Sequence, residues 1–322
     1  MTSSSQSAAP FDRRAIPAGA REEVWKAADG HAIRTLDLGE PDGAPRGSLL
    51  FLPGRGDFYE KYLEALWHWR SQGWRVASAD WRGQAMSGRL SRDGDTGHVA
   101  DFGLWVDDLA ALFAASVGKH PGPHVVIGHS MGGHLVLRAL AERRIAPDAA
   151  VLSAPMLGFL PARMPVSFTH TMARTMARLR GADTPAWKGS ERPGRDPDER
   201  LDLLTHDADR YSDEVWWRKQ RPGLGLGPPS WGWIERAVAS CRSLQQPGLL
   251  ESVETPVLLL ATTNDALVAY PPVARAAERL PKGKLVRFGD EARHELLREA
   301  EPVRSRVLAE IDGFLDGVAP AR

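Results

Sequence analysis

The chain has 322 residues, of which 43% are hydrophobic and 25% are charged, as in an ordinary globular protein. Basic and acidic residues number 41 each, so no net charge favours nucleic acid or an anionic membrane as a partner. A single cysteine, Cys241, excludes an internal disulfide, and no cysteine and histidine cluster has the spacing of a metal site. We expect Cys241 to be a small apolar filler.

The first ten residues are rich in serine and alanine and lack the basic start and apolar core of a signal peptide. No apolar run is long enough to span a bilayer. We therefore expect a cytoplasmic protein with a disordered leader over residues 1–20. A peripheral contact with the inner membrane stays open, and the sequence indicates no oligomeric state.

Strands and helices alternate along the first half of the chain. A hairpin is expected at Asp29-Gly30, between strands over residues 22–27 and 32–38. After it we expect a strand, a helix, a strand and a helix over residues 48–52, 58–72, 74–79 and 101–117. This alternation predicts a mostly parallel sheet with helices on both faces, the architecture of an α/β protein.

The alternation stops over residues 155–252 and then resumes. This segment contains five tryptophans, and its clearest helices are expected over residues 169–179 and 231–243. Strands are expected again over 256–261 and 284–288, and helices over 272–280 and 303–315. We interpret 155–252 as a helical cap, inserted between a core of 21–154 and 253–322, over the strand ends where open α/β sheets bind ligands.

The pentapeptide Gly128-His129-Ser130-Met131-Gly132 lies between a β-branched run and a run of helix formers. Strand, sharp turn and helix form the setting of a nucleophile elbow, in which a strained serine stands exposed above the sheet. Gly128 and Gly132 have no Cβ, so the strand and the helix can approach closely. Glycine-rich turns contain this pattern by chance, but in this setting we interpret Ser130 as a nucleophile.

A serine nucleophile needs a base, and an acid to orient that base. In the α/β-hydrolase order the acid follows the serine and the histidine comes last. Asp265 follows the expected strand 256–261, although it could simply cap the next helix. His294 is the only histidine beyond His206 and follows the strand 284–288. Asp290 competes with Asp265 as the acid, but it lies very near His294 in sequence.

The tetrahedral intermediate needs two hydrogen-bond donors for its oxyanion. The expected donors are the backbone N–H groups of Met131, which follows the nucleophile, and of Arg55, in the loop after strand 48–52. A plain tight turn would also explain Gly54 and Gly56 in that loop.

Several motifs occur together in the order of one known family. They are Leu52-Pro53-Gly54-Arg55-Gly56, Glu60-Lys61-Tyr62, Asp80-Trp81-Arg82-Gly83-Gln84, Gly97-His98-Val99, Gly128 to Gly133 and His294-Glu295-Leu296. With them the chain resembles the monoacylglycerol lipase and lysophospholipase branch of the α/β-hydrolases, within the serine aminopeptidase-like hydrolases, over almost its whole length from Arg21. The bacterial lysophospholipases are the most similar group.

This resemblance implies hydrolysis of a carboxylic ester on a single-chain lipid, with no cofactor and no metal. It does not settle the substrate. Pro53-Gly54 stands where monoacylglycerol lipases usually carry His-Gly. Ala85 stands where the family has glycine, and alanine tolerates positive φ poorly, so we expect that loop to be reshaped.

Two other functions stay open beside the lipid esterase. One is a general carboxylesterase or thioesterase acting on small acyl substrates. The other is a non-catalytic binding protein, against which the retention of Ser130, Asp265 and His294 argues. For a lipid substrate, the residues expected to line an apolar channel are Met156, Trp216, Trp217, Trp231 and Trp233.

Overall fold

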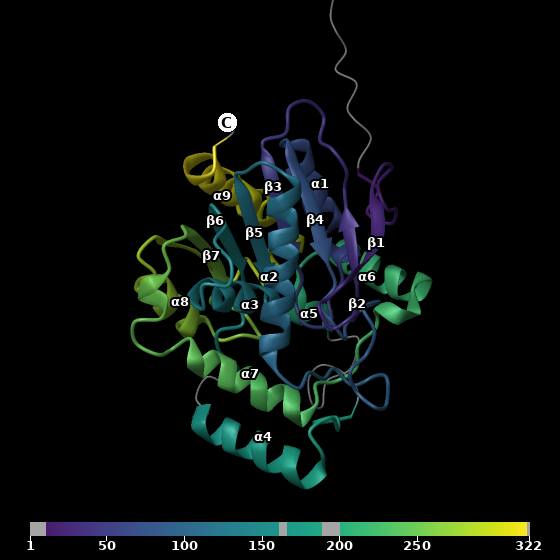
Figure 1. Ribbon diagram of the computed structural model, residues 1–322, viewed down its shortest axis with the longest axis vertical. Helices are drawn as coiled ribbons and strands as arrows, with labels where there is room; N and C mark the ends of the chain where they lie inside the picture. The colour runs from purple at the N-terminus through teal and green to yellow at the C-terminus, as the bar shows by residue number, and fades with distance from the viewer. Residues whose placement is uncertain (1–10, 161–165, 189–199, 321–322) are drawn as a thin grey trace, which may run out of the picture.

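The computed structural model describes residues 11–160, 166–188 and 200–320 (Figure 1). Its centre is an eight-stranded sheet in the order β1-β2-β4-β3-β5-β6-β7-β8. The strands are β1 (Arg21–Lys26), β2 (Ala32–Asp37), β3 (Gly47–Leu52), β4 (Trp74–Ala79), β5 (His124–His129), β6 (Ala149–Ser153), β7 (Val257–Thr262) and β8 (Gly283–Phe288). Only the pairs β1–β2 and β2–β4 are antiparallel, so the predicted mostly parallel α/β sheet is confirmed.

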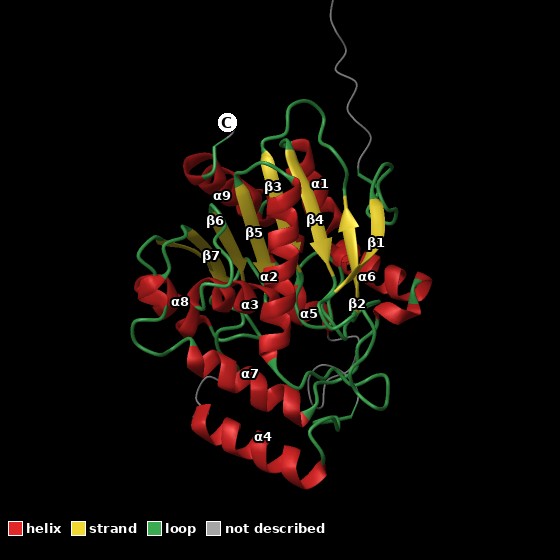
Figure 2. Cartoon of the chain, in the orientation of Figure 1, coloured by secondary structure: helices red, strands yellow, loops and turns green. Residues whose placement is uncertain are grey.

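Helices cover both faces of the sheet (Figure 2). Helices α2 (Phe102–Lys119), α3 (Met131–Ala141) and α8 (Tyr270–Arg279) pack into one apolar cluster, and α1 (Leu63–Ser71) and α9 (Val303–Val318) into another. Alternate residues of β3 belong to the two apolar clusters, because neighbouring side chains of a strand point to opposite faces of the sheet. Every residue of β3, β6 and β7 is buried, as a sheet covered on both faces requires.

The helix expected over residues 58–72 is divided in two. Tyr59–Tyr62 forms a 3₁₀ turn and α1 begins only at Leu63. All four residues of the turn are buried, and the side chains of Glu60 and Lys61 form ion pairs inside the protein. A sequence that places two charged side chains next to each other gives no sign that both will be buried.

In the described part of the segment between β6 and β7 there are four α-helices: α4 (Val166–Arg180), α5 (Leu201–Leu204), α6 (Ala208–Gln220) and α7 (Trp231–Ser243). Helices α4 and α7 pack on each other beyond the carboxyl ends of the parallel strands (Figure 1). The helices expected over 169–179 and 231–243 are therefore present, the first slightly longer than expected.

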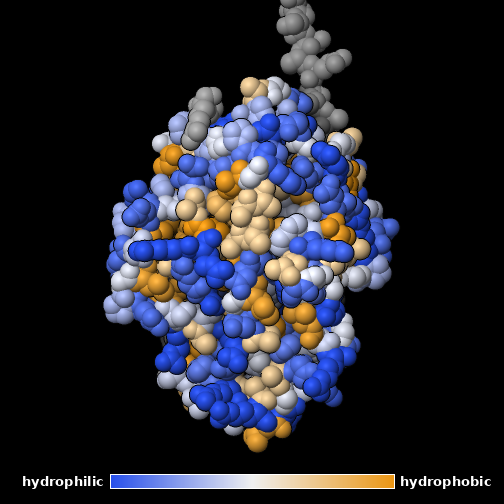
Figure 3. Space-filling view, viewed as in Figure 1, coloured by the Kyte–Doolittle hydropathy of each residue, from blue (hydrophilic) through white to orange (hydrophobic). Residues whose placement is uncertain are grey.

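The outer side of α4 is apolar and exposed. Phe168, Met172 and Leu179 have exposed fractions of 57%, 38% and 76%. Ala173, which is buried, lies roughly 100–140° around the helix from these residues, and α4 packs on α7. At the lower end of the molecule, where α4 lies, the surface shows apolar atoms beside strongly hydrophilic ones (Figure 3).

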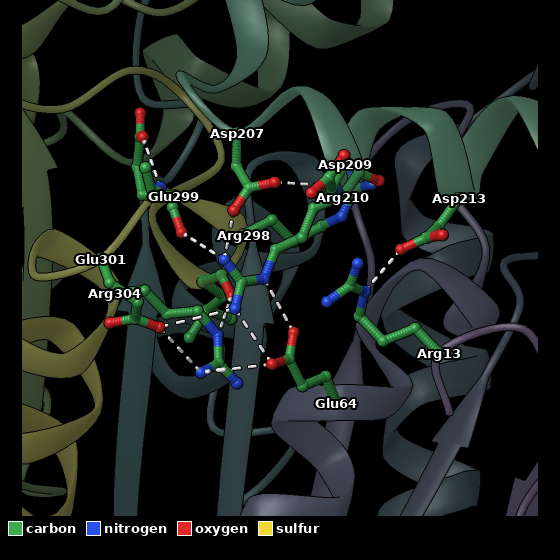
Figure 4. A network of polar contacts seen from close by, with 12 residues as sticks. Arg13, Glu64, Asp207, Asp209, Arg210, Asp213, Arg298, Glu299, Glu301 and Arg304 are labelled. Carbon is green, nitrogen blue, oxygen red and sulfur yellow. Dashed lines mark hydrogen bonds and ion pairs between the residues drawn. The ribbon is translucent and has the colours of Figure 1, made fainter. Parts of the chain in front are cut away.

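Ion pairs hold helix α6 against the core of the protein. The Arg210 guanidinium is 2.7 Å from the Glu64 carboxylate of α1 and also contacts Asp207 and the backbone of Glu299 (Figure 4). Arg221, which follows α6, pairs with Glu22 and Glu60 of the core. Because of these contacts, α6 forms part of the outer surface of the core.

Residues 11–20 pack against the protein, contrary to the disordered leader expected over 1–20. Phe11 stacks on Trp67 with ring centroids 5.7 Å apart, and Arg13 and Arg14 both pair with Asp213 of α6. An aromatic side chain and two cations that meet complementary partners hold this segment in place. Residues 1–10 lie outside the described residues.

Among the described residues, no helix combines the length and the apolar composition needed to cross a membrane.

Candidate active site

Ser130 lies in a strained turn between β5 and α3. Its φ of 52° and ψ of −115° are rare for a residue with a side chain. Hydrogen bonds fix this turn: the Ser130 N–H donates to the Ser153 carbonyl at 2.9 Å, and the Ser130 carbonyl accepts from Met156 at 3.0 Å. The strained backbone of a nucleophile elbow, predicted from the pentapeptide, is therefore present.

The two glycines beside Ser130 are required by close backbone contacts. A Cβ on Gly128 would lie 2.7 Å from the carbonyl of Gly132, and a Cβ on Gly132 would lie 2.4 Å from the Leu52 oxygen. Any larger residue would push α3 away from the strands.

His294 connects Ser130 to Asp265. The His294 Nε2 lies 3.0 Å from Ser130 Oγ, and its Nδ1 lies 2.7 Å from Asp265 Oδ2. The other oxygen of Asp265 accepts the N–H groups of Leu267 and Val268 at 2.8 and 2.9 Å. These bonds fix the carboxylate and, through it, the imidazole ring. Asp290, the other candidate acid, is exposed at the surface.

The charges of the site favour a protonated His294. Burial alone would lower the pKa of His294, but the charge and hydrogen bond of Asp265, together with the charges of Glu295 and Asp57, hold the pKa above its ordinary value of 6.5. Burial would likewise raise the pKa of Asp265, and the charge of His294 instead keeps it lowered. With Asp265 ionised, Nδ1 of a neutral His294 carries the proton and Nε2 can accept the Ser130 hydroxyl proton.

His129 stays neutral beside this pair. Its ring lies 4.9 Å from that of His294, centroid to centroid. Burial, and then the charge of His294, lower the pKa of His129 to about 4.

The loop after β3 lies against Ser130. A Cβ on Gly54 would lie 3.1 Å from the Ser130 Cβ. The Gly54 N–H donates to Asp57 Oδ2 at 3.1 Å, and the Gly56 N–H donates to Gln84 Oε1 at 2.7 Å. Arg55 lies between these two anchored amides. Met131 begins α3, where the N–H groups of a helix have no partner within the helix.

The loop that contains Ala85 has this residue at positive φ, a conformation that favours glycine. Ala85 has a φ of 45°, and Gly83 and Gln84 hydrogen-bond across the turn to Ser87 and Trp81. The buried loop holds this alanine at positive φ, at a cost of about 1–2 kcal/mol.

A cavity of about 550 Å³ opens above Ser130 and His294, within the usual size range for small-molecule sites. Much of its wall is apolar, from Met156, Phe159, Leu160, Trp187, Leu204, Pro229, Trp233, Leu267 and Val268. Its polar wall includes the side chains of Arg55, Asp57, Arg200 and Glu295.

Two of the five residues predicted to line a channel, Met156 and Trp233, line this cavity. The prediction is wrong for Trp216 and Trp217, because α6 packs against the core, where Trp217 Nε1 donates to the Arg13 carbonyl. The prediction is also wrong for Trp231. This residue lies two positions before Trp233, so its side chain points about 200° around α7 from that of Trp233.

Several lining residues were missed by the sequence reasoning. Phe159, Trp187 and Leu267 lie on loops with no periodic pattern, so only their apolar character was visible. Asp57 directly follows one recognised motif and Glu295 belongs to another, but neither was assigned to the site. The expectation for Cys241 holds: it is buried, and burial raises the pKa of its thiol to about 12.

Comparisons with known proteins agree with this geometry. The family model described as "Serine aminopeptidase, S33" matches residues 43–301. Lysophospholipase L2 of Escherichia coli K12 is 31% identical over 283 residues, which cover 83% of this chain and 80% of that protein. A monoacylglycerol lipase of Mycolicibacterium smegmatis is 31% identical over 136 residues, 42% of this chain and 47% of that protein.

Solved structures share the fold at lower identity. A soluble variant of monoglyceride lipase from Saccharomyces cerevisiae superposes with a TM-score of 0.75 and 17% identity, covering 96% of this chain and 98% of that one. A carboxyl esterase from Bacillus coagulans gives a TM-score of 0.68 and 16% identity, covering 93% and 99%. The sheet order, the strained serine and the family match lead to one assignment: the chain is an α/β-hydrolase of the serine aminopeptidase S33 family.

Proposed function

We propose that the protein is a serine hydrolase that cleaves the carboxylic ester of a single-acyl lipid, a lysophospholipid or a monoacylglycerol. The observation that carries this proposal is the hydrogen-bonded series Ser130–His294–Asp265 at a cavity with a largely apolar wall. The names of the relatives, lysophospholipase and monoacylglycerol lipase, support the same substrate class.

The chemistry follows from the hydrogen bonds. As Ser130 Oγ attacks the ester carbonyl, its proton passes to His294 Nε2, and Asp265 stabilises the imidazolium. The backbone N–H groups of Met131 and Arg55 are the proposed donors to the oxyanion. His294 then protonates the leaving alcohol, and an acyl group remains on Ser130. Water, activated by His294, releases the fatty acid by the same steps in reverse order.

The inserted segment 155–252 is the proposed cap, and it would select the acyl group. From this segment Met156, Phe159, Trp187 and Trp233 contribute to the apolar wall, whereas Ser130, His294 and Asp265 all come from the core. A buried methylene contributes about 0.8 kcal/mol, so kcat/KM should rise with acyl length until the wall is covered.

An acyl-length series of kcat/KM tests this function. The substrates are lysophospholipids and monoacylglycerols of increasing chain length, with short aryl esters for comparison. Trp233→Ala should flatten the rise with chain length and spare the short aryl ester, because a short acyl group does not reach Trp233. Trp216→Ala, a change of the same kind outside the cavity, should leave the series unchanged. A wild-type optimum at acetate would contradict the lipid substrate and favour a small-ester hydrolase.

We also propose that α4 rests on an anionic lipid surface and brings the cavity to its substrate. Its exposed residues Phe168, Met172 and Leu179 are spaced i, i+4, i+11 along one side of the helix. Its charged residues, Arg174, Arg178 and Arg180, are all basic, and such a helix suits the interface of an anionic membrane. A cytoplasmic location stays a prediction from the sequence.

A further inference from the structure

Asp57 is a buried carboxylate at the site that no step of the mechanism above uses. Its side chain is 6% exposed and lines the cavity with Ser130 and His294. Oδ1 accepts from the Lys61 ammonium at 2.5 Å. Oδ2 accepts from two donors, the Gly54 N–H at 3.1 Å and the Tyr62 hydroxyl at 2.9 Å. Both oxygens therefore have hydrogen-bond partners, and one partner belongs to the loop beside the nucleophile.

The bond to Gly54 fixes the backbone at the proposed oxyanion donor. Because glycine has wide conformational freedom, the peptide between Gly54 and Arg55 could rotate and turn the Arg55 N–H away from the substrate. Asp57 holds the amide before this peptide, and Gln84 holds the amide after it. With both neighbours anchored, the direction of the Arg55 N–H is set before substrate arrives.

Lys61 keeps Asp57 ionised and in place. Burial would raise the pKa of Asp57, but Lys61 holds it well below its usual range, so the carboxylate remains an acceptor. Lys61 is fully buried, and its ammonium also lies 2.6 Å from Glu295, the residue after His294, and 2.9 Å from Glu214 of α6. One cation thus connects the loop after β3, the histidine loop and α6.

We propose that Asp57 is a positioning residue of the oxyanion loop, formed by residues 53–56. Asp57 contacts no reacting atom in the proposed mechanism and acts by holding the Gly54 amide. This inference rests on the proposed function, because it assumes that the Arg55 N–H binds the oxyanion. It predicts a defect in the transition state rather than in substrate binding, since the oxyanion forms only there.

Asp57→Asn tests the inference with little change in shape. The new NH₂ cannot face the Lys61 ammonium, which only donates, so it turns toward Tyr62, whose hydroxyl can accept, and toward the Gly54 N–H, which cannot. The hydrogen bond to Gly54 is therefore lost. We expect kcat on a short aryl ester to fall about 10-fold, less than the 100- to 1000-fold that follows complete loss of an oxyanion donor. KM should change little. Affinity for a trifluoromethyl ketone, whose adduct with Ser130 carries an oxyanion, should fall in parallel with kcat.

Asp108→Asn is the matched control. Asp108 is similarly buried, with 5% of its side chain exposed, and pairs with Arg82 through two hydrogen bonds. It lies on α2 and does not line the cavity. Both variants should have a lower Tm, because each leaves a buried cation less well paired. Only Asp57→Asn should lose kcat and inhibitor affinity.

Unchanged kcat and inhibitor affinity in Asp57→Asn, or equal losses in the two variants, would overturn the inference. If Asp57→Asn does not fold, Tyr62→Phe removes one of the donors to Oδ2, and a smaller fall in kcat and inhibitor affinity is expected. Wild-type values in that variant would contradict the role of Asp57. A wild-type protein without ester turnover would overturn the proposed function and this inference together, whereas turnover retained in Asp57→Asn overturns the inference alone.

Discussion

At His294, burial and the neighbouring carboxylates have opposite effects on the pKa of the imidazole. Burial disfavours the imidazolium, and Asp265, whose carboxylate lies 2.7 Å from Nδ1, favours it through its charge and its hydrogen bond. The carboxylates of Glu295 and Asp57 also raise the pKa of His294, while the neighbouring His129 is neutral above about pH 4. A base that binds a proton more readily is a better acceptor for the proton of Ser130.

This balance predicts the pH dependence of the enzyme. Ester cleavage needs neutral His294, and the pKa of His294 is raised, so kcat/KM should fall on the acidic side with a midpoint above 6.5. Asp265→Asn removes the group that raises this pKa most, so the midpoint should move to lower pH and kcat should fall on the order of 10⁴-fold. A pH–rate profile of each protein checks both effects.

The control for this prediction is Asp290→Asn, which alters an exposed carboxylate in the same loop region as His294. Its profile should match that of the wild type. Full activity in Asp265→Asn together with loss in Asp290→Asn would move the acid to Asp290.

The three residues that hydrogen bonds join at the site could be predicted from their order in the chain. Ser130 is marked by its glycines, and Asp265 and His294 by their positions after two late strands. Asp57 could not be assigned in this way, because its partners Lys61, Gly54 and Tyr62 matter only once β3 and the following turn are folded. Nothing in the local sequence tells a buried lysine from a solvated one.

Among the elements, the apolar strands β3 and β7 were predicted to within one residue at each end, because fully buried strands allow few other side chains. The inserted segment was harder. Helix α6 has charged residues on several sides, and ion pairs to α1 and to residues 13–14 determine where it packs. Its tryptophans therefore face the core, and composition alone placed them wrongly over the site.

The proposed contact between α4 and a lipid surface predicts the effect of removing the apolar side chains of this helix. Phe168→Ser with Leu179→Ser should weaken binding to vesicles of phosphatidylglycerol and phosphatidylcholine by about tenfold or more, since burying one such side chain contributes about 1.5–3 kcal/mol. Binding of the wild type should also weaken in high salt and on vesicles of phosphatidylcholine alone. Vesicle co-sedimentation measures both effects.

Val24→Ser is the matched control, because Val24 is 65% exposed on β1, away from α4 (Figure 1). It should bind vesicles like the wild type, and all variants should cleave a short aryl ester normally. A wild-type protein that does not bind anionic vesicles, or an equal loss in Val24→Ser, would contradict the role of α4.

In the molecule as a whole, the proposed function is shared between the core and the segment inserted between β6 and β7. In the proposed mechanism the core supplies the nucleophile, base and acid from the carboxyl ends of the parallel strands, and β5, β7 and β8 bring together residues up to 164 positions apart in the chain. The segment between β6 and β7 supplies much of the apolar wall. Chemistry and substrate selection can therefore be altered separately, by variants of the core or of α7.

Labelling with a fluorophosphonate, together with turnover of a long-chain lysophospholipid or monoacylglycerol, tests the role of Ser130 most directly. The wild type should be labelled once, at Ser130, and should release fatty acid. Ser130→Ala should lose the label and on the order of a million-fold in turnover, with an unchanged circular dichroism spectrum. Label at another residue, or turnover retained in Ser130→Ala, would contradict the assignment of Ser130 as the nucleophile.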